Sequence, residues 1–224
     1  MAYRAPRVNA TNVARAGRQS LLGCCVVLAI AACSHHHTTT MPTTTAAPDV
    51  DSLIVSVEDA RRIASFEDLT PDAHADTRKP SRGDPNAPGP CRAASNSDLT
   101  FGSRWTAFRR VGYIAATDAL APGEGVSMVA EVSQAVAMYA NSDTARQVLD
   151  RLESSLRACA ALRDPDYDFT LERPDDSTLK LSAADWSHLY REKSSVLISV
   201  GVVGLERTDQ IANNVLQTVT DRIN

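Results

Sequence analysis

The sequence predicts an α+β domain in which about three helices pack on a mainly antiparallel sheet. Some segments alternate apolar and polar residues with a period of two, whereas three others repeat apolar residues every three or four positions. The segments follow one another as helix, two strands, helix, several strands and helix, an order typical of α+β folds. This domain is predicted to span residues 51–224.

Each predicted helix begins at a residue suited to capping its free N–H groups. Ser56 precedes a short helix over residues 57–64. Asn141 begins a longer helix, which ends at Arg163-Asp164-Pro165 because proline cannot continue it. The last helix begins at Thr208 and carries an apolar stripe on one face.

The predicted strands are separated by turn-forming residues. They cover residues 104–115, 127–139, 167–172, 179–182, 186–192 and 194–205. In residues 127–139 both faces are mostly small or apolar, which predicts a central position in the sheet. Residues 71–90 are rich in Pro, Gly, Arg and Asp and predict a long surface loop.

Residues 1–32 have the layout of a secretory signal. Four arginines and no acidic residue come first, and an apolar run over residues 21–32 follows. As a helix this run rises about 18 Å, which is short of the ~30 Å hydrocarbon core, so a transmembrane span is the weaker alternative.

The cleavage site predicts a lipoprotein. Ile30-Ala31-Ala32-Cys33 resembles a lipobox, so we expect cleavage before Cys33 and acylation of its thiol on the extracytoplasmic face of the cell membrane. The alternative is an ordinary secreted protein. Residues 33–50 are rich in Thr and Pro and predict a disordered tether, in which His35-His36-His37 is expected to be a solvated spacer and no metal site.

The charge balance bears on the partners. Removing residues 1–32 takes away four of the 23 Lys and Arg and none of the 27 Asp and Glu, which leaves a formal charge of −8. A scattered acidic charge argues against nucleic acid, which needs basic patches. It also argues against electrostatic adhesion to anionic lipid, so the membrane is expected as a partner only through acyl chains.

Two cysteines remain in the exported domain. Cys91 and Cys159 are an even pair in an oxidising compartment, which is most simply a disulfide. Such a bridge would contribute about 4 kcal/mol by chain entropy, less any strain. The alternatives are a buried free pair or a reactive thiol.

No catalytic constellation can be assembled from the sequence. Ser127 lacks the second glycine of a nucleophile elbow, and neither His74 nor His188 has an evident partner. The alternation of Asp164, Asp166 and Asp168 lacks the glycine and the final glutamate of a calcium loop, and no glycine-rich phosphate loop occurs. The sequence therefore predicts neither an enzyme, a cofactor nor a metal site.

Four residues are candidates for contacting a ligand. Trp105, Tyr139 and Trp186 are aromatic residues of predicted strands that could line a pocket, and Arg109 could meet an anionic group. The alternatives are core positions for the aromatic side chains and a solvated strand face for the arginine.

Several short motifs follow one another in a recognisable order. They are Cys91-Arg92-Ala93-Ala94, then Gly102 to Ala107, Val132 to Tyr139 running into Ser142 to Ala145, and Ser154 to Cys159. Their order and spacing resemble the PknH-like extracytoplasmic sensor domain, a family found in mycobacterial receptor kinases and lipoproteins. The resemblance implies an α+β sandwich with a ligand groove and no known catalytic residues. His188 stands where the family often has a cysteine of a second bridge, and no cysteine occurs near residues 201–204.

The expected function is that of a membrane-anchored binding module for an unknown small envelope molecule or partner protein. Two alternatives stay open, an unrecognised cell-envelope hydrolase and a purely structural envelope lipoprotein.

Overall fold

The computed structural model describes residues 49–120 and 127–223, and its second compact unit spans Ala47–Asn224. The predicted signal peptide at residues 1–32, Cys33 and the tether as far as residue 48 lie outside the described residues. Val50, at the start of the described residues, is buried.

The helices and strands follow the predicted order. They are the 3-10 helix η1 (Val50–Leu53), α1 (Val57–Ala64), β1 (Thr70–Pro71), the 3-10 helix η2 (Gly89–Cys91), α2 (Arg92–Ser95), α3 (Ser97–Phe101), β2 (Trp105–Leu120), β3 (Ser127–Tyr139), α4 (Ser142–Leu162), the 3-10 helix η3 (Pro165–Tyr167), β4 (Thr170–Asp175), β5 (Thr178–Ser182), β6 (Trp186–Lys193), β7 (Val196–Val203) and α5 (Thr208–Asp221).

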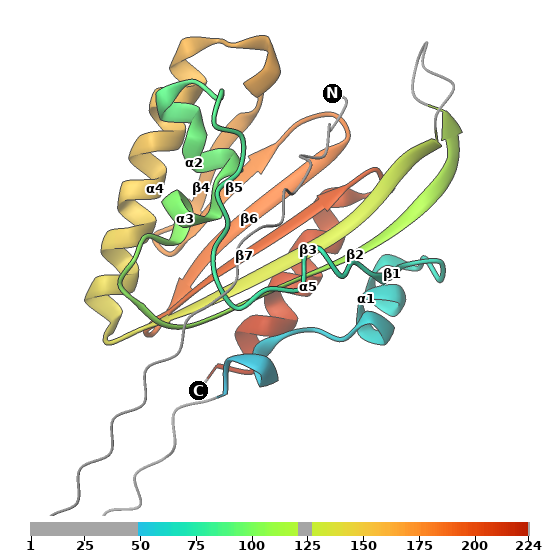
Figure 1. Ribbon diagram of the computed structural model, residues 1–224, viewed down its shortest axis with the longest axis horizontal. Helices are drawn as coiled ribbons and strands as arrows, with labels where there is room; N and C mark the ends of the chain where they lie inside the picture. Colours follow the sequence, from blue (N-terminus) through green and yellow to red (C-terminus); the bar gives the residue numbers. More distant parts are fainter. Residues whose placement is uncertain (1–48, 121–126, 224) are drawn as a thin grey trace, which may run out of the picture. The chain divides into compact units, whose positions relative to one another are not determined.

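The strands form one 7-stranded sheet in the order β1-β2-β3-β7-β6-β5-β4, with every neighbouring pair antiparallel (Figure 1). A β2–β3 hairpin and a β4–β7 meander are joined through the β3–β7 pair, and α4 lies in the connection between them. The predicted α+β fold with a mainly antiparallel sheet is confirmed.

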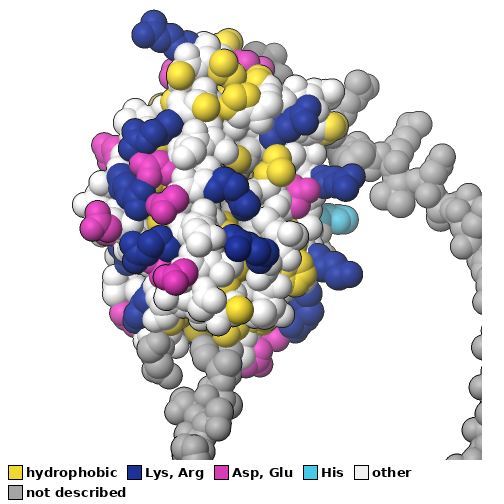
Figure 2. All heavy atoms as spheres, turned by 90° about the vertical axis from the view of Figure 1, so that its left-hand side faces the viewer, with side chains coloured by type: hydrophobic (Ala, Val, Ile, Leu, Met, Phe, Trp, Pro, Cys, Tyr) yellow, Lys and Arg dark blue, Asp and Glu magenta, His cyan; other side chains and the backbone are white. Residues whose placement is uncertain are grey.

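Helices cover both faces of the sheet. The core on one face joins η1, α1 and α5 to β3 and β7, and the core on the other face joins α3 and α4 to the same two strands. Every residue of β7 except Val203 is buried, because one set of alternate side chains enters each core. The outward face of α4 carries charges of both signs, and hydrophobic side chains gather where α4 gives way to η3 (Figure 2).

A buried polar contact fixes the N-terminal segment to the sheet. The Gln134 Oε1 atom of β3 accepts a hydrogen bond from the Val55 N–H at 2.9 Å, and its Nε2 donates to the Val55 carbonyl at 2.8 Å. The Tyr113 hydroxyl donates to the same carbonyl at 2.6 Å. The backbone groups of Val55 are thus satisfied beneath the core, where leaving them unpaired would cost about 1–3 kcal/mol each.

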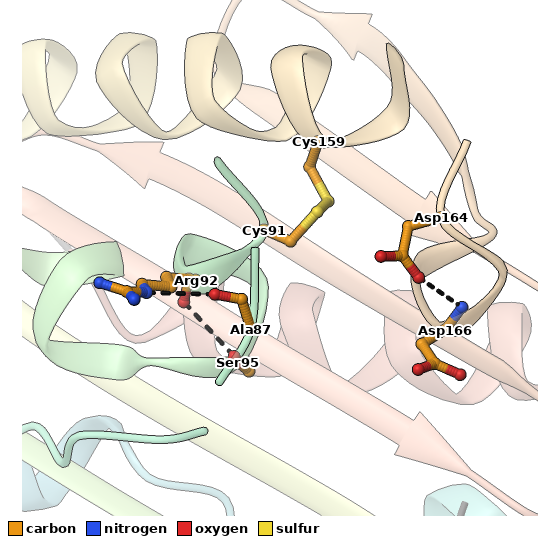
Figure 3. Close-up of a disulfide and its surroundings, with 7 residues drawn as sticks. All are labelled: Ala87, Cys91, Arg92, Ser95, Cys159, Asp164 and Asp166. Carbon is orange, nitrogen blue, oxygen red and sulfur yellow. Dashed lines mark hydrogen bonds between the residues drawn. A yellow bond between two sulfur atoms is a disulfide. The ribbon is translucent and has the colours of Figure 1, made fainter. Parts of the chain in front are cut away.

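The disulfide between Cys91 and Cys159 is present and confirms the predicted pairing (Figure 3). Its Cα atoms are 4.7 Å apart, and both side chains are fully buried. Cys159 lies on the buried face of α4, and Cys91 ends η2. Arg92 Nε donates to the Ala87 carbonyl, so the loop beside the bridge is also held. The bridge fastens the end of the long loop to α4.

Helices α1, α4 and α5 begin where the sequence predicts. Ser56 and Asn141 accept hydrogen bonds from the N–H groups of Asp59 and Thr144, as N-caps do. The short helices α2 and α3 were not predicted, since four and five residues are too few to show a helical period. Within residues 49–120 and 127–223, no helix combines the length and the apolar character needed to cross a membrane.

Removing the disulfide should destabilise the domain without unfolding it. The bridge closes a loop with a sequence separation of 68, so Cys91→Ser with Cys159→Ser should cost up to about 4 kcal/mol and lower Tm by on the order of 10 °C. Calorimetry on the purified protein measures this. Reductant should leave the double variant unchanged, and a wild-type Tm insensitive to complete reduction would contradict the prediction.

Candidate ligand-binding site

Helices α2 to α4 cover only part of their sheet face, and the β2–β3 hairpin extends beyond them (Figure 1). Small residues and one imidazole form a cross-strand row on this face. The register pairs Gly112 with Ser133, Ser133 with Gly201, and Gly201 with His188. Small side chains therefore line the sheet surface along this row, which ends at His188 on β6.

A pocket of about 430 Å³ opens at the His188 end of this row. This volume lies within the roughly 300–1,000 Å³ of typical small-molecule sites. The segment after α4, the β5–β6 turn and α2 form its walls. Its lining residues are Ala94, Pro165, Asp166, Tyr167, Asp168, Phe169, Leu181, Ala183, Ala184, Asp185, Trp186, His188 and Tyr190.

The first wall is the segment from Pro165 to Phe169, and its course is set by the end of α4. Arg163 has a φ of 52°, in the left-handed region, which terminates the helix. Asp164 then caps η3 by accepting a hydrogen bond from the Asp166 N–H at 3.0 Å, and Pro165 occupies the first turn (Figure 3). Strand β4 consequently begins at Thr170, three residues later than predicted.

The second wall is the β5–β6 turn, which carries Trp186. The Ala183 N–H donates to the Trp186 carbonyl at 3.0 Å, and the Gly204 N–H donates to the Asp185 carbonyl at 3.0 Å. Gly204 has a φ of +68°, and a Cβ there would lie 2.4 Å from the Val129 carbonyl oxygen, so only glycine fits. The Phe169 and Trp186 rings, one from each wall, contact each other edge to face, with centroids 6.2 Å apart and an interplanar angle of 61°.

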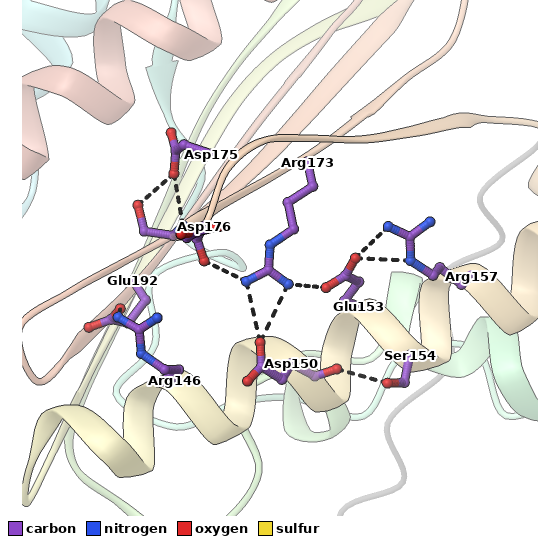
Figure 4. A network of polar contacts seen from close by, with 10 residues as sticks. Arg146, Asp150, Glu153, Ser154, Arg157, Arg173, Asp175, Asp176 and Glu192 are labelled. Carbon is purple, nitrogen blue, oxygen red and sulfur yellow. Dashed lines mark hydrogen bonds and ion pairs between the residues drawn. The ribbon is translucent and has the colours of Figure 1, made fainter.

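A charge network fastens β4 to α4 and so fixes the first wall from behind (Figure 4). Arg173 of β4 forms ion pairs with Asp150 and Glu153, and Arg157 donates to Glu153 from the next helical turn. Burial opposes ionisation of Glu153, but the hydrogen bonds from Arg157 and Arg173 keep its pKa below the usual value. Glu153 and Arg173 are mostly buried, with side-chain exposures of 14% and 25%. Their shared ion pairs hold the two side chains in one geometry.

His188 is the titratable side chain at the inner wall. Its ring stacks on Tyr190 at 4.5 Å, and Nε2 lies 2.7 Å from Ser199 Oγ. Burial, with a smaller contribution from Arg110, lowers the pKa of His188 to about 4, so the imidazole is neutral at pH 7. Gly201 makes room for it, since a Cβ there would lie 3.1 Å from Nδ1.

The His188–Ser199 pair does not form a catalytic triad in the described part of the chain. Ser199 is 8% exposed and lies within a central strand, and no carboxylate is hydrogen-bonded to His188 Nδ1 there. An imidazole with so low a pKa is also a weak general base. Across the described ranges, no group of three His, Cys, Asp or Glu side chains is placed to hold a metal ion.

Of the four predicted ligand contacts, Trp186 lines the pocket and the other three lie elsewhere. Tyr139 is buried and its hydroxyl donates to the Phe101 carbonyl at 2.9 Å, while Trp105 packs against Phe108 at the same end of the sheet. Arg109 lies on the opposite sheet face and forms ion pairs with two carboxylates, Asp51 and Asp76. The four residues therefore do not form one cluster.

Sequence reasoning missed the aromatic residues of the first wall. Tyr167 and Phe169 were expected in a strand, where residues two positions apart face the same side of the sheet. The signal that could have placed them is Asp164-Pro165, an N-cap followed by proline at the first helical position. That pair predicts a helical turn, which changes the direction of both rings.

The chain is similar to proteins of one family. The family model of the PknH-like extracellular domain matches residues 45–222. Among solved structures, the chain is similar to the extracellular domain of PknH from Mycobacterium tuberculosis, with 16% identity, a TM-score of 0.57 and coverage of 77% of this chain and 93% of that chain. At this identity the structural likeness shows the fold alone. No curated protein matches the chain.

The depressed pKa of His188 should make stability fall in mild acid. The unfolded ring takes up a proton near pH 6.5 but the folded ring only near pH 4, so this contribution is complete above pH 6.5 and is lost as pH falls towards 4. His188→Gln should therefore reduce the loss between pH 7.5 and pH 5 by at most about 2 kcal/mol, measured by urea unfolding. His74→Gln, in the exposed loop, is the matched control and should behave as wild type. Identical pH profiles for His188→Gln and wild type would contradict the assignment.

Proposed function

The chain belongs to the PknH-like extracellular domain family, and from this premise we propose that its domain is a sensor-like module that binds a small molecule without converting it. The observation that carries the proposal is the pocket between η3 and the β5–β6 turn. It is large enough for a small ligand, and Tyr167, Phe169 and Trp186 line it beside one neutral polar anchor, His188.

The architecture supports binding in this pocket because its walls are fixed before any ligand arrives. In the first wall, Asp164 caps η3, and the Arg173–Glu153 ion pair links the following strand β4 to α4. In the second wall, the Gly204 N–H donates a hydrogen bond to the Asp185 carbonyl. A preformed site loses little conformational entropy on binding, so ordering the walls offsets less of the favourable contact energy. The Cys91–Cys159 bridge holds the α2 end, which contributes Ala94 to the lining.

The absence of turnover is part of the proposal. In the described part of the chain, the hydroxyl hydrogen-bonded to His188 belongs to Ser199, which is buried in the sheet, and the imidazole is too weak a base to activate it at neutral pH. A hydrolase would need both an accessible nucleophile and a base of suitable pKa. The same pocket therefore favours a binder over the hydrolase alternative.

The cellular setting proposed for this module is the extracytoplasmic face of the cell membrane. The motif Ile30-Ala31-Ala32-Cys33 follows an apolar run, and residues 34–48 supply a polar spacer rich in threonine. Acyl chains on Cys33 would then be the membrane anchor of a domain whose net charge is negative.

Ligand binding in the pocket predicts a stability gain and a fluorescence change. A ligand at a hundredfold excess over Kd raises the free energy of unfolding by about 2.7 kcal/mol, which shifts Tm by several degrees. Thermal-shift screening with envelope lipids, glycans and peptidoglycan fragments should yield such a ligand, and Trp186→Leu should weaken its binding. Trp105→Leu is the matched control, since Trp105 lies outside the lining. If a ligand binds Trp186→Leu with the same affinity as the wild type, its site lies outside this pocket. If the protein converts a ligand to product, the hydrolase alternative is favoured.

Acylation of Cys33 predicts membrane attachment that depends on one thiol. The wild-type protein should partition into the detergent phase, and Cys33→Ala should not, because that variant has no thioether-linked lipid. Cys24→Ala is the matched control, since Cys24 belongs to the predicted signal peptide. The mass of the N-terminal peptide checks the modification directly, and full membrane cofractionation of Cys33→Ala would contradict it.

A further inference from the structure

We propose that the ligand of this pocket carries a cationic group of the ammonium class on an apolar body, with the cation at the pocket mouth. This inference rests on the binding function proposed above and adds the charge and the orientation of the ligand. It is based on the cavity itself, on the aromatic walls and on the distribution of charge around them.

The mouth of the pocket is negatively charged. Asp166 and Asp168 reach it from the first wall and Asp185 from the second, and all three residues are exposed; we call them the acidic rim. Within residues 49–120 and 127–223, none of these carboxylates forms an ion pair or accepts a side-chain hydrogen bond from Lys or Arg. Three unneutralised charges from two segments therefore converge on one opening.

Several carboxylates of neighbouring elements do have cationic partners. Asp150 and Glu153 of α4 pair with Arg173, Glu192 of β6 pairs with Arg146, and Asp209 of α5 pairs with Lys180 at 2.6 Å. The protein neutralises these four carboxylates, whereas the three of the acidic rim are open to a cation from solution. A ligand cation is the complementary charge that would fill this position.

Among the residues that the structure describes, no lysine or arginine lines the pocket. Arg163 lines a neighbouring cavity, and Arg110 acts on His188 from β2 on the same sheet face. His188 itself is neutral at pH 7. The potential is consequently negative at the mouth and close to neutral at the inner wall, which sets the orientation of the ligand.

The aromatic walls suit a cation that is attached to an apolar body. Phe169 and Trp186 are inclined by 61° and separated by 6.2 Å, so they form two adjacent walls rather than a parallel stack. Inclined aromatic walls can offer ring faces to an alkylammonium group, whose attraction to a ring is about 0.5–2 kcal/mol. Leu181 and Tyr190 at the inner end are apolar surfaces for the rest of the molecule.

The test compares three probes that share one aromatic body: phenylpropyl-trimethylammonium, phenylpropanol and phenylpropanoate. The purified protein should carry Trp105→Phe, which leaves Trp186 as the single tryptophan of the 2 in the chain. Titration of its fluorescence should give a Kd for the ammonium probe roughly tenfold below that of the alcohol, with the carboxylate weakest. Raising the ionic strength from about 0.05 to 0.5 M should weaken the ammonium probe alone, because exposed charges are screened.

Variants locate the charge that is responsible. Asp168→Asn with Asp185→Asn should weaken the ammonium probe several-fold and leave the alcohol unchanged, whereas Asp176→Asn, in the exposed β4–β5 turn, should affect neither. Equal or tighter binding of the alcohol, or an ammonium affinity insensitive to the rim substitutions, would overturn the cationic assignment and leave the binding function intact. If none of the three probes changes the fluorescence or the Tm, both the cationic ligand and the pocket as a binding site are overturned.

Discussion

Strands β3 and β7 are apolar on both faces, and this two-sided burial determines where the other elements lie. A strand that is buried on only one side could lie at the edge of the molecule, but these two need a helical layer on each face. Helices α1 and α5 form one layer, and α2 to α4 form the other. Because the second layer is shorter than the strands beneath it, one end of that face keeps an opening, and the pocket lies there.

The two layers are fastened by different chemistry. On the α1 side, Gln134 and Tyr113 hold Val55 by hydrogen bonds that are protected from water, so they remain strong as long as the core is intact. On the α4 side, where the layer begins with a long loop of few apolar residues, a covalent bridge does the same task. The loop offers little apolar surface to bury, which explains why a disulfide bond rather than hydrophobic packing secures its end.

The fold was predictable from the sequence, whereas the pocket was predictable only in part. Ser56, Asn141 and the periodicity of α4 and α5 act locally, and the chemistry of two exported cysteines leaves one simple pairing. Trp186 was a candidate as an aromatic residue of a predicted strand, and it lines the pocket. Tyr167 and Phe169 were misplaced because a single helical turn at Pro165 shifts the strand start, and short turns leave no period to detect.

The features that the sequence did not predict depend on contacts between residues far apart in the chain. Arg109 is a candidate anion contact when only its neighbours in sequence are considered, yet it pairs with Asp51 and Asp76, which lie more than thirty residues earlier in the chain. The register that sets Gly201 opposite His188 is likewise a long-range property. The resemblance placed a second bridge of the family in this region, and here an imidazole beside a glycine occupies that place.

The segment from Pro165 to Phe169 separates the pocket from a neighbouring cavity of about 440 Å³, and Pro165, Tyr167, Asp168 and Phe169 line both. The two cavities are nearly equal in volume and share four of their lining residues. A substitution at any of these four positions therefore changes the shape of both cavities at once, so the two cannot be altered independently through this segment.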